Sequence, residues 1–280
     1  LYAVRVKTAR GYEFRAPTAA DLEAVARAEA ALREKLPLWE AQGLIPREPF
    51  PEISNDPRPL HYGMTTWADF FSPRQLLALG TWVETFRELR PQWRQALPPE
   101  DARALETYLA FAFDKACDHN SRMARWESTR NVIKGTFDRH DFSFKWSHAE
   151  MAVIAEGKGF DWALEQVAEA YQGLARLLQP AQLPLFRREG KAPVERLEIR
   201  QANAADLSHL PDGAVHLICV DPPYYANVMY AELSDFFYVW QKRLLKDTYP
   251  ELFQAELTDK EEEAVANPAR FAAFGRKREE

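Results

Sequence analysis

Residues 215–224 read VHLICVDPPY, and this stretch indicates the class of fold. The first six residues are apolar except for His216. A short, almost wholly apolar run is typical of a strand buried on both faces, as in a parallel sheet covered by helices. Asp221 to Tyr224 follow directly, at the carboxyl end of this strand, where open α/β sheets bind their ligands. The stretch therefore predicts an α/β protein with a site that begins at Asp221.

The residues on either side complete the pattern of such a sheet. Residues 194–200 (VERLEIR) alternate as a second strand does, and a helix is expected from about Met229 to Leu245. The residues expected to face inward from this helix are Leu233, Phe236, Phe237, Trp240 and Leu244. The order strand, loop, strand, loop, helix is typical of a doubly wound α/β sheet.

The upstream part of the chain is predicted to be mostly helical. We expect a hairpin over residues 2–16, a helix that begins at Thr18, and an extended proline-rich segment over residues 45–61. Further helices are expected to begin at Ser72-Pro73, near Pro99 to Asp101 and at Phe160, the last with an apolar stripe. The predicted regions are 1–60 (hairpin, helix and linker), 61–190 (helical insertion) and 191–280 (catalytic segment).

The residue types of Asp221-Pro222-Pro223-Tyr224 suit one particular chemistry. The exocyclic amine of a nucleobase is a poor nucleophile, and a pair of acceptors for its two hydrogens would favour attack on a methyl group. Asp221 would supply one acceptor and the carbonyl of Pro222 the other, held rigidly by the two prolines. Tyr224 offers a ring for a base taken out of its stack. The alternative is that these four residues simply form a turn.

The run from Asp221 to Arg243, DPPYYANVMYAELSDFFYVWQKR, resembles the catalytic segment of a known family. The family comprises large prokaryotic adenine-specific DNA methylases that begin with an uncharacterised N-terminal domain. Other stretches resemble the same family in order: Tyr62-Gly63-Met64-Thr65 with Trp67, 71–80, Tyr108-Leu109-Ala110, Asn120-Ser121 with Trp126, Trp146 to Glu150, Leu257-Thr258, and Asn267-Pro268-Ala269-Arg270.

The resemblance implies a fold, a cofactor and a substrate. The fold would be part of a Rossmann-like methyltransferase sheet with a large helical insertion, and the cofactor S-adenosylmethionine. The substrate would be the exocyclic amine of adenine in DNA. In such enzymes an acidic residue near the cofactor's adenine follows the preceding strand, and Asn203 and Asp206 occupy that place. Asp206 could equally close a turn before Leu207.

A glycine-rich loop for the methionine end of the cofactor is missing from the sequence. Gly157-Lys158-Gly159 is the nearest match, but no strand is expected before it, and we interpret it as a turn. In the family this loop lies upstream of the segment seen in this sequence. We therefore expect that an N-terminal part of the same protein, before Leu1, supplies the loop, and that the 280 residues alone are inactive.

The composition is that of an ordinary soluble protein, with 46% hydrophobic and 28% charged residues. No apolar run is long enough to span a bilayer and no signal peptide is visible, so a cytoplasmic location without membrane contact is expected. Cys117 and Cys219 have neither the spacing nor the partners of a metal site, so we expect no metal and two buried thiols. The net charge of −6 counts mildly against a simple DNA-binding domain.

Residues 119–150 interleave basic side chains with aromatic ones. The basic set is His119, Arg122, Arg125, Arg130, Lys134, Arg139, His140 and Lys145, and the aromatic set is Trp126, Phe137, Phe142, Phe144 and Trp146. This pattern suits a nucleic-acid surface. Alternatively, the rings belong to the core and the charges to a solvated face. Two further pairs are ambiguous between a site and a structural role: His148 with Glu150, and Glu232 with Asp235.

Together these observations predict transfer of a methyl group from S-adenosylmethionine to adenine N6 in DNA. The same tetrapeptide would also suit methylation of cytosine N4 or of RNA. The rival hypothesis is a non-catalytic, nucleic-acid-binding or regulatory relic of a methyltransferase fold. Asp221 and Tyr224 favour the enzyme, whereas Asn203 in place of an acid favours the relic.

Overall fold

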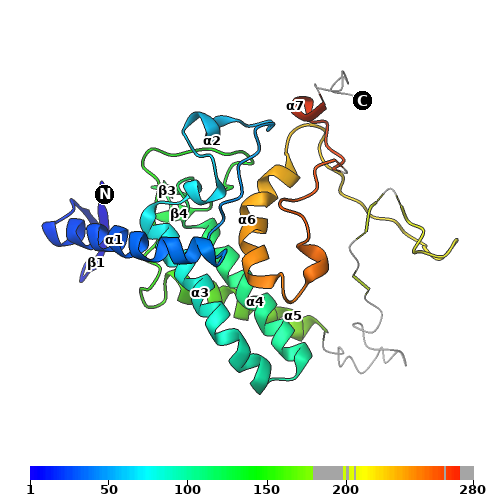
Figure 1. The fold of residues 1–280 in the computed structure, drawn as a ribbon, viewed down its shortest axis with the longest axis horizontal. Helices are drawn as coiled ribbons and strands as arrows, with labels where there is room; N and C mark the ends of the chain where they lie inside the picture. The colour runs from blue at the N-terminus through cyan, green and yellow to red at the C-terminus, as the bar shows by residue number, and fades with distance from the viewer. Residues whose placement is uncertain (179–197, 200–201, 205, 262, 272–280) are drawn as a thin grey trace.

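The computed structural model describes residues 1–178, 198–199, 202–204, 206–261 and 263–271 (Figure 1). The chain begins with a hairpin of β1 (Val4–Thr8) and β2 (Gly11–Arg15), followed by α1 (Ala19–Ala41) and the short α2 (Arg58–His61). The long helices α3 (Pro73–Ala96) and α4 (Pro99–Asp118) come next, then the strands β3 (Arg125–Glu127) and β4 (Val132–Lys134). Helices α5 (Gly159–Leu178), α6 (Tyr230–Leu245) and α7 (Pro268–Phe271) complete the order, with short 3-10 turns at Trp67–Phe70 and Pro250–Leu252.

The helix starts predicted from capping residues are confirmed. The Thr18 side chain accepts a hydrogen bond from the Asp21 amide, and the Asp21 carboxylate accepts one from the Thr18 amide. Ser72 and Gln75 form the same capping box at the start of α3. Such reciprocal pairs satisfy amides that have no partner within the helix. The predicted hairpin over residues 2–16 is also present, with β1 and β2 paired antiparallel.

Helices α1, α3, α4 and α6 enclose the main core. Helix α3 packs against α1 and α4, and α4 packs against α5 and α6. The Trp39 ring of α1 lies directly over Gly80 of α3, where any side chain would collide with it. On the other side of the bundle, Phe113 of α4 packs against Trp240 of α6, with ring centroids 5.3 Å apart. Close approach of α1 and α3 therefore depends on a glycine, and that of α4 and α6 on two large rings.

Aromatic residues from distant parts of the sequence fill the remainder of this core. Phe50, Trp67 and Phe70 lie within 5.7 Å of one another, centroid to centroid. Phe142 contacts this group at 5.3 Å from Phe50, and Phe236 of α6 lies 6.3 Å from Phe70. The helix predicted for the catalytic segment thus shares one core with the helical region, and the three-part division of the chain stays a prediction.

The buried strand predicted over residues 215–220 is wrong for this structure. These residues have no regular secondary structure, and Leu217 is 83% exposed and Val220 76%. Cys219, predicted to be buried, is exposed as well. A strand buried on both faces requires neighbouring strands and helices over both faces. In the described ranges both sheets are two-stranded antiparallel hairpins, so they offer this segment no such place.

The rest of the predicted Rossmann-like sheet is not seen either. Of the second predicted strand, residues 194–197 and 200 lie outside the described residues, and Ile199 is exposed without strand structure. In Figure 1 the yellow chain that leads to α6 extends away from the helices. The described structure is therefore a mixture of helices with two small sheets.

The predicted apolar stripe of α5 is only partly buried. Ala163 is fully buried, but Leu164 and Leu174 are 39% and 47% exposed. Helix α5 packs mainly against α4, and its first turn also contacts α3 through Phe160 and Trp82, whose ring centroids are 4.7 Å apart, so one side of the stripe is covered. No helix in the described ranges has the length and apolar character needed to cross a membrane.

Candidate functional site

The segment Asp221 to Tyr224 is largely exposed and has no regular secondary structure. The Tyr224 hydroxyl donates a hydrogen bond to Asp221 Oδ1 over 3.2 Å. The next residue, Tyr225, has a positive φ of 56°, and its amide donates to the Pro223 carbonyl over 3.0 Å. A positive φ is uncommon for a residue with a side chain and marks a position that its surroundings constrain. The backbone turn lies one step later, where the Asn227 amide donates to the Tyr224 carbonyl over 3.1 Å, and Asp221 and Tyr224 are both exposed just before it.

The chain after this turn is attached firmly to the helical body. The Ala266 amide donates to the Tyr225 carbonyl over 3.2 Å. Met229, directly before α6, is buried, and Glu263 accepts a hydrogen bond from the Ala231 amide in the first turn of α6 over 2.8 Å. A carboxylate at a helix N-terminus also interacts favourably with the helix dipole. The position of the Asp221 segment is thus set from its C-terminal side.

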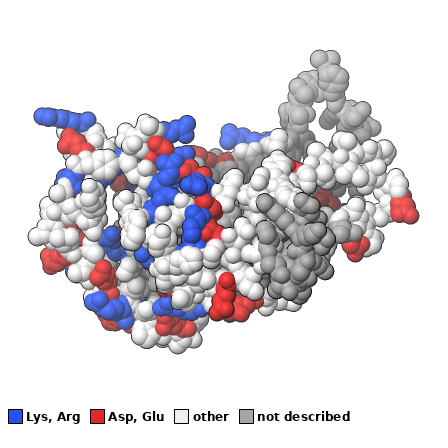
Figure 2. All heavy atoms as spheres, turned by 90° about the horizontal axis from the view of Figure 1, so that it is seen from above, with Lys and Arg blue, Asp and Glu red and all other residues white. Residues whose placement is uncertain are grey.

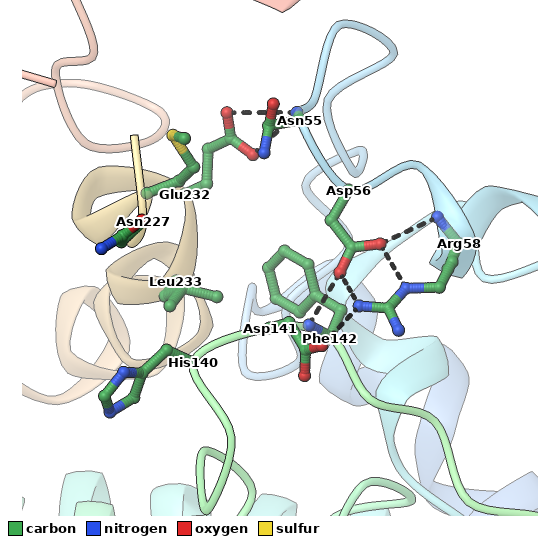
Figure 3. Close-up of a pocket in the computed structure, with 10 residues that line it drawn as sticks. Asn55, Asp56, Arg58, His140, Asp141, Phe142, Asn227, Glu232 and Leu233 are labelled. Carbon is green, nitrogen blue, oxygen red and sulfur yellow. Dashed lines mark hydrogen bonds and ion pairs between the residues drawn. The ribbon is translucent and has the colours of Figure 1, made fainter. Parts of the chain in front are cut away.

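A cavity of about 280 Å³ opens between this segment and the core (Figure 3). Three parts of the chain line it: 55–58, 140–142, and the end of the Asp221 loop with the start of α6. The lining residues are Asn55, Asp56, Arg58, His140, Asp141, Phe142, Asn227, Met229, Glu232 and Leu233. Polar groups outnumber apolar ones in this set, which is the chemistry of a site for a polar ligand.

Glu232 is the most constrained acid of the cavity. Its side chain is 3% exposed, and its carboxylate accepts hydrogen bonds from Ser54 Oγ at 2.7 Å, the Asn55 amide at 3.2 Å and Asn267 Nδ2 at 2.7 Å. Arg270 Nη2 lies 3.6 Å from the same carboxylate. A buried charge is tolerated when it is paired and hydrogen-bonded in this way. Glu232 thus ties residues 54–55 to α6 and fixes one wall of the cavity.

Asp56, Arg58 and Asp141 form the opposite wall. Arg58 donates to both oxygens of Asp56, at 2.6 and 2.5 Å, and lies 3.0 Å from Asp141. Hydrogen bonding to Asp56, reinforced by Asp141, raises the pKa of Arg58. The Phe142 amide donates to Asp56 over 2.9 Å. Asp141 Oδ1 is buried with no hydrogen-bond partner in the described structure.

Asp235, three residues after Glu232, has a structural role. Burial raises the pKa of its carboxyl group, against the opposing effect of Lys260. Lys260 Nζ lies 2.7 Å away, and the Thr258 amide and hydroxyl donate to Asp235 at 2.8 and 2.7 Å. The side chain therefore attaches residues 258–260 to α6. Glu232 and Asp235 were each expected to have either a site or a structural role, and of these two only Glu232 lines the cavity.

Asn203 and Asp206 do not form a cofactor pocket in this structure. Both are exposed, and neither lines the cavity. The Asp206 carboxylate accepts a hydrogen bond from the Ser208 amide over 2.9 Å, which lowers the pKa of Asp206. This is the geometry of a residue that closes a turn, the alternative that the sequence left open. The described residues around them do not fit S-adenosylmethionine, because none of these described residues encloses a pocket there.

His148 and Glu150 are a structural pair. Arg74 donates to both carboxylate oxygens of Glu150, at 2.7 and 2.8 Å, and His148 Nε2 lies 3.8 Å away. Although burial by itself raises the pKa of Glu150, hydrogen bonds from His148 and Arg74 bring it down to about 2. The ion pair between Glu150 and Arg74 attaches the loop after β4 to the start of α3.

Several side chains of residues 119–150 match the second alternative, a core with a charge-paired face, and the nucleic-acid surface stays a prediction. Phe142 is in the core, and Arg125 is paired with Glu127 at 2.9 Å and with Asp138 at 2.6 Å. Trp146, in contrast, is 86% exposed. One part of this stretch therefore belongs to the core and to a charge-paired face, and another part presents an aromatic ring to solvent.

Sequence reasoning missed the wall formed by Asn55, Asp56 and Arg58. These residues lie in the stretch interpreted only as a proline-rich linker, and their contacts with Glu232 and Asp141 are made across many residues of sequence. The available signal was a group of polar side chains, Ser54-Asn55-Asp56, directly before Pro57. Such a group in a conformationally restricted loop is a common feature of binding sites.

No group of three or more His, Cys, Asp and Glu side chains is arranged to hold a metal ion in the part of the chain that the structure describes. Comparisons with models of protein families, with curated proteins and with solved structures find no match for this chain.

Proposed function

We propose that this chain is the catalytic segment of an S-adenosylmethionine-dependent DNA methyltransferase that acts on adenine N6. Asp221-Pro222-Pro223-Tyr224 would be its catalytic loop. The observation that supports this most is the position of the loop: it is exposed, and Asn227 and Met229, directly after it, line a polar cavity together with Glu232. A site in which an exposed acid and ring adjoin a polar cavity suits a base rotated out of its stack.

In this proposal the chain's own residues bind and orient the amine. One Asp221 oxygen and the Pro222 carbonyl accept its two hydrogens, and Tyr224 stacks on the base. In the observed geometry the Tyr224 hydroxyl occupies Asp221 Oδ1. An entering amine would therefore displace that hydrogen bond, which frees the Tyr224 ring to turn toward the base.

The cofactor would be held mainly by residues that this structure does not contain. When bound, S-adenosylmethionine supplies the methyl group. The proposal places the glycine-rich loop in another part of the same protein, which would also provide strands beside residues 215–220. The exposure of Leu217, Ile218 and Val220 supports this, because such an apolar run is unfavourable in water and suits a sheet covered by helices. A Rossmann-like sheet would therefore form once those strands lie beside residues 215–220.

One observation favours a second candidate function. Asn203 stands where an acid is expected, and the residues around it form no enclosed pocket. A non-catalytic relic that binds nucleic acid would share these features. Measurement of methyl transfer separates the two candidates, since the relic would transfer none.

The experiment compares Asp221→Ala with Asp212→Ala in the complete gene product. Asp212 is an exposed acid in a turn of the same segment, so it controls for loss of a charge. We expect Asp221→Ala to reduce transfer of labelled methyl groups to DNA by at least about 100-fold, since a lost transition-state hydrogen bond has effects of that order. Asp212→Ala should remain active. More than about a tenth of the activity in Asp221→Ala would contradict the assigned role.

A further inference from the structure

Three aromatic rings form a cluster beside the cavity, and we propose that this cluster binds unpaired bases of a single DNA strand. The rings are those of Tyr62, Phe144 and Trp146, which we call the ring cluster. The inference rests on the proposed function in that the strand would be the substrate DNA next to the target base. It goes further by naming where the neighbouring nucleotides bind.

The geometry of the ring cluster is well defined. Tyr62 stacks on Phe144 with centroids 5.0 Å apart and an interplanar angle of 22°. Trp146 meets both edge to face, at 6.1 Å from Tyr62 and 6.0 Å from Phe144. The Arg122 guanidinium lies 5.0 Å from the Phe144 centroid, and it donates to the Asp69 carbonyl over 3.2 Å. Phe144 is therefore the anchored member, and the other two rings are held against it.

These two outer rings are open to solvent. Trp146 is 86% exposed and Tyr62 48%. Single exposed aromatic residues are ordinary, but rings held together on a surface present a flat apolar area already arranged for a ligand. Nucleobases stack on such rings whatever their identity, because every base has a π face. Bases in an intact duplex are already stacked on one another, so the cluster selects an unpaired strand.

The charge around the ring cluster suits a phosphate backbone. Burial lowers the pKa of Lys145, and the positive charges of Arg139, Arg125 and Arg58 lower it further against the opposing effect of Asp141. These four basic groups therefore lie near one another, and each of the three arginines is also paired with an acid. Residues 119–150 hold six Lys and Arg against four Asp and Glu, in a chain with a net charge of −6. Figure 2 shows Lys and Arg interspersed with Asp and Glu in a band on one face. A local surplus of basic side chains, such as the one in residues 119–150, attracts phosphates even when the whole molecule is acidic.

The ring cluster is built from two of the three segments that line the cavity. Arg58 begins α2 and lines the cavity, and Tyr62 is the C-cap residue of that four-residue helix. Phe142 also lines the cavity, and Phe144 and Trp146 follow it along the same loop. A strand with one base in the cavity would therefore place adjoining bases at the ring cluster.

The test is binding of a fluorescein-labelled single-stranded oligonucleotide to the complete gene product, followed by anisotropy. We expect Trp146→Ala to weaken binding roughly five- to a hundredfold, the range for loss of one stacked base. Trp146→Phe should restore most of the affinity, because a smaller ring still stacks. Leu177→Ala is the matched control: Leu177 is 76% exposed on α5, away from both segments, and should bind as the unaltered protein does.

The outcomes separate this inference from the proposed function. Methyl transfer by Asp221→Ala tests the catalytic assignment, and strand binding by Trp146→Ala tests the ring cluster, so an active Asp221→Ala protein would contradict only the catalytic assignment. Equal affinity of Trp146→Ala and the unaltered protein would overturn the inference. So would tighter binding of a matched duplex than of the single strand, tighter binding of an RNA strand of the same sequence, or no oligonucleotide binding at all.

Discussion

Asp114 is a buried acid that the proposed chemistry does not use. It lies on α4, and Gln241 of α6 donates a hydrogen bond to its Oδ2 over 2.5 Å. Burial is the main cause that raises its pKa, to about 7, and the charge of Asp118 adds to it, whereas Gln241 acts in the opposite direction. Its other oxygen, Oδ1, has no hydrogen-bond partner in the described structure. The ionised form is therefore destabilised in the folded state.

At the scale of single residues, the burial of Asp114 predicts a pH dependence of stability. The pKa of Asp114 in the folded state, about 7, lies above its ordinary value of 3.8. The free energy of unfolding should therefore fall as pH rises from about 4 to 7, because the folded state must release a proton that it holds more tightly. Asp114→Asn removes this loss and keeps an acceptor for Gln241. We expect it to raise the free energy of unfolding by about 1–4 kcal/mol at pH 8, measured by urea denaturation.

The matched control is Asp101→Asn. Asp101 is an exposed acid in the first turn of the same helix, so its substitution should leave the pH dependence between 5 and 8 unchanged. An Asp114→Asn protein whose stability still falls between pH 5 and 8 like that of the unaltered chain would show that another group is responsible.

At the scale of elements, the turn before α5 shows how two glycines with similar backbones differ. Gly157 and Gly159 have φ values of +63° and +55°, a region that residues with a side chain seldom adopt. Around Gly157 there is open space, whereas a Cβ on Gly159 would collide with the backbone of Val153. The Phe160 amide donates to the Val153 carbonyl over 3.0 Å, so this backbone cannot easily move. The turn predicted at Gly157-Lys158-Gly159 is confirmed, and Gly159 is its critical residue.

This contrast predicts different costs for the same substitution. Gly157→Ala should lower the free energy of unfolding by about 1 kcal/mol, from backbone strain alone. Gly159→Ala adds a steric collision in a packed site and should cost about 2–4 kcal/mol. Thermal denaturation of the two variants measures the difference. Equal melting temperatures would mean that residues 153–159 rearrange without cost.

At the scale of the whole molecule, the described residues form a helical body with the candidate site at one edge of it. The cavity depends on contacts between residues far apart in sequence, such as Ser54 with Glu232 and Asp56 with the Phe142 amide. The chain that precedes the site, residues 215–220, is mostly exposed and makes no such contacts with the other described residues. Among the described residues, long-range contacts therefore shape the cavity but not the segment before Asp221.

We therefore predict that the 280-residue chain alone binds S-adenosylmethionine weakly and transfers no methyl group. A cofactor of this kind requires backbone N–H groups brought close to it by glycines, and an acid for its ribose. Isothermal titration with the cofactor should give a dissociation constant well above the low micromolar range. A low micromolar value would show that residues 1–280 contain a complete cofactor site.

The sequence by itself determined the local elements of this protein. Thr18 and Ser72 marked helix starts because a capping side chain satisfies amides within one turn. The inner face of α6 was predicted from Phe236, Trp240 and Leu244, because the spacing of apolar residues along a helix can be recognised within a short stretch of sequence. The turn at Gly157-Lys158-Gly159 was likewise a local signal, carried by its glycines.

Only the tertiary structure determined which segments pack against these elements. Residues 215–220 have the composition of a buried strand, but a strand forms only where neighbouring strands complete its hydrogen bonds, and the described residues provide none. The cavity wall of Asn55, Asp56 and Arg58 could not be predicted either, because it too depends on partners elsewhere in the chain. Its partners, Asp141 and Glu232, are distant in sequence, and local patterns carry no information about such contacts.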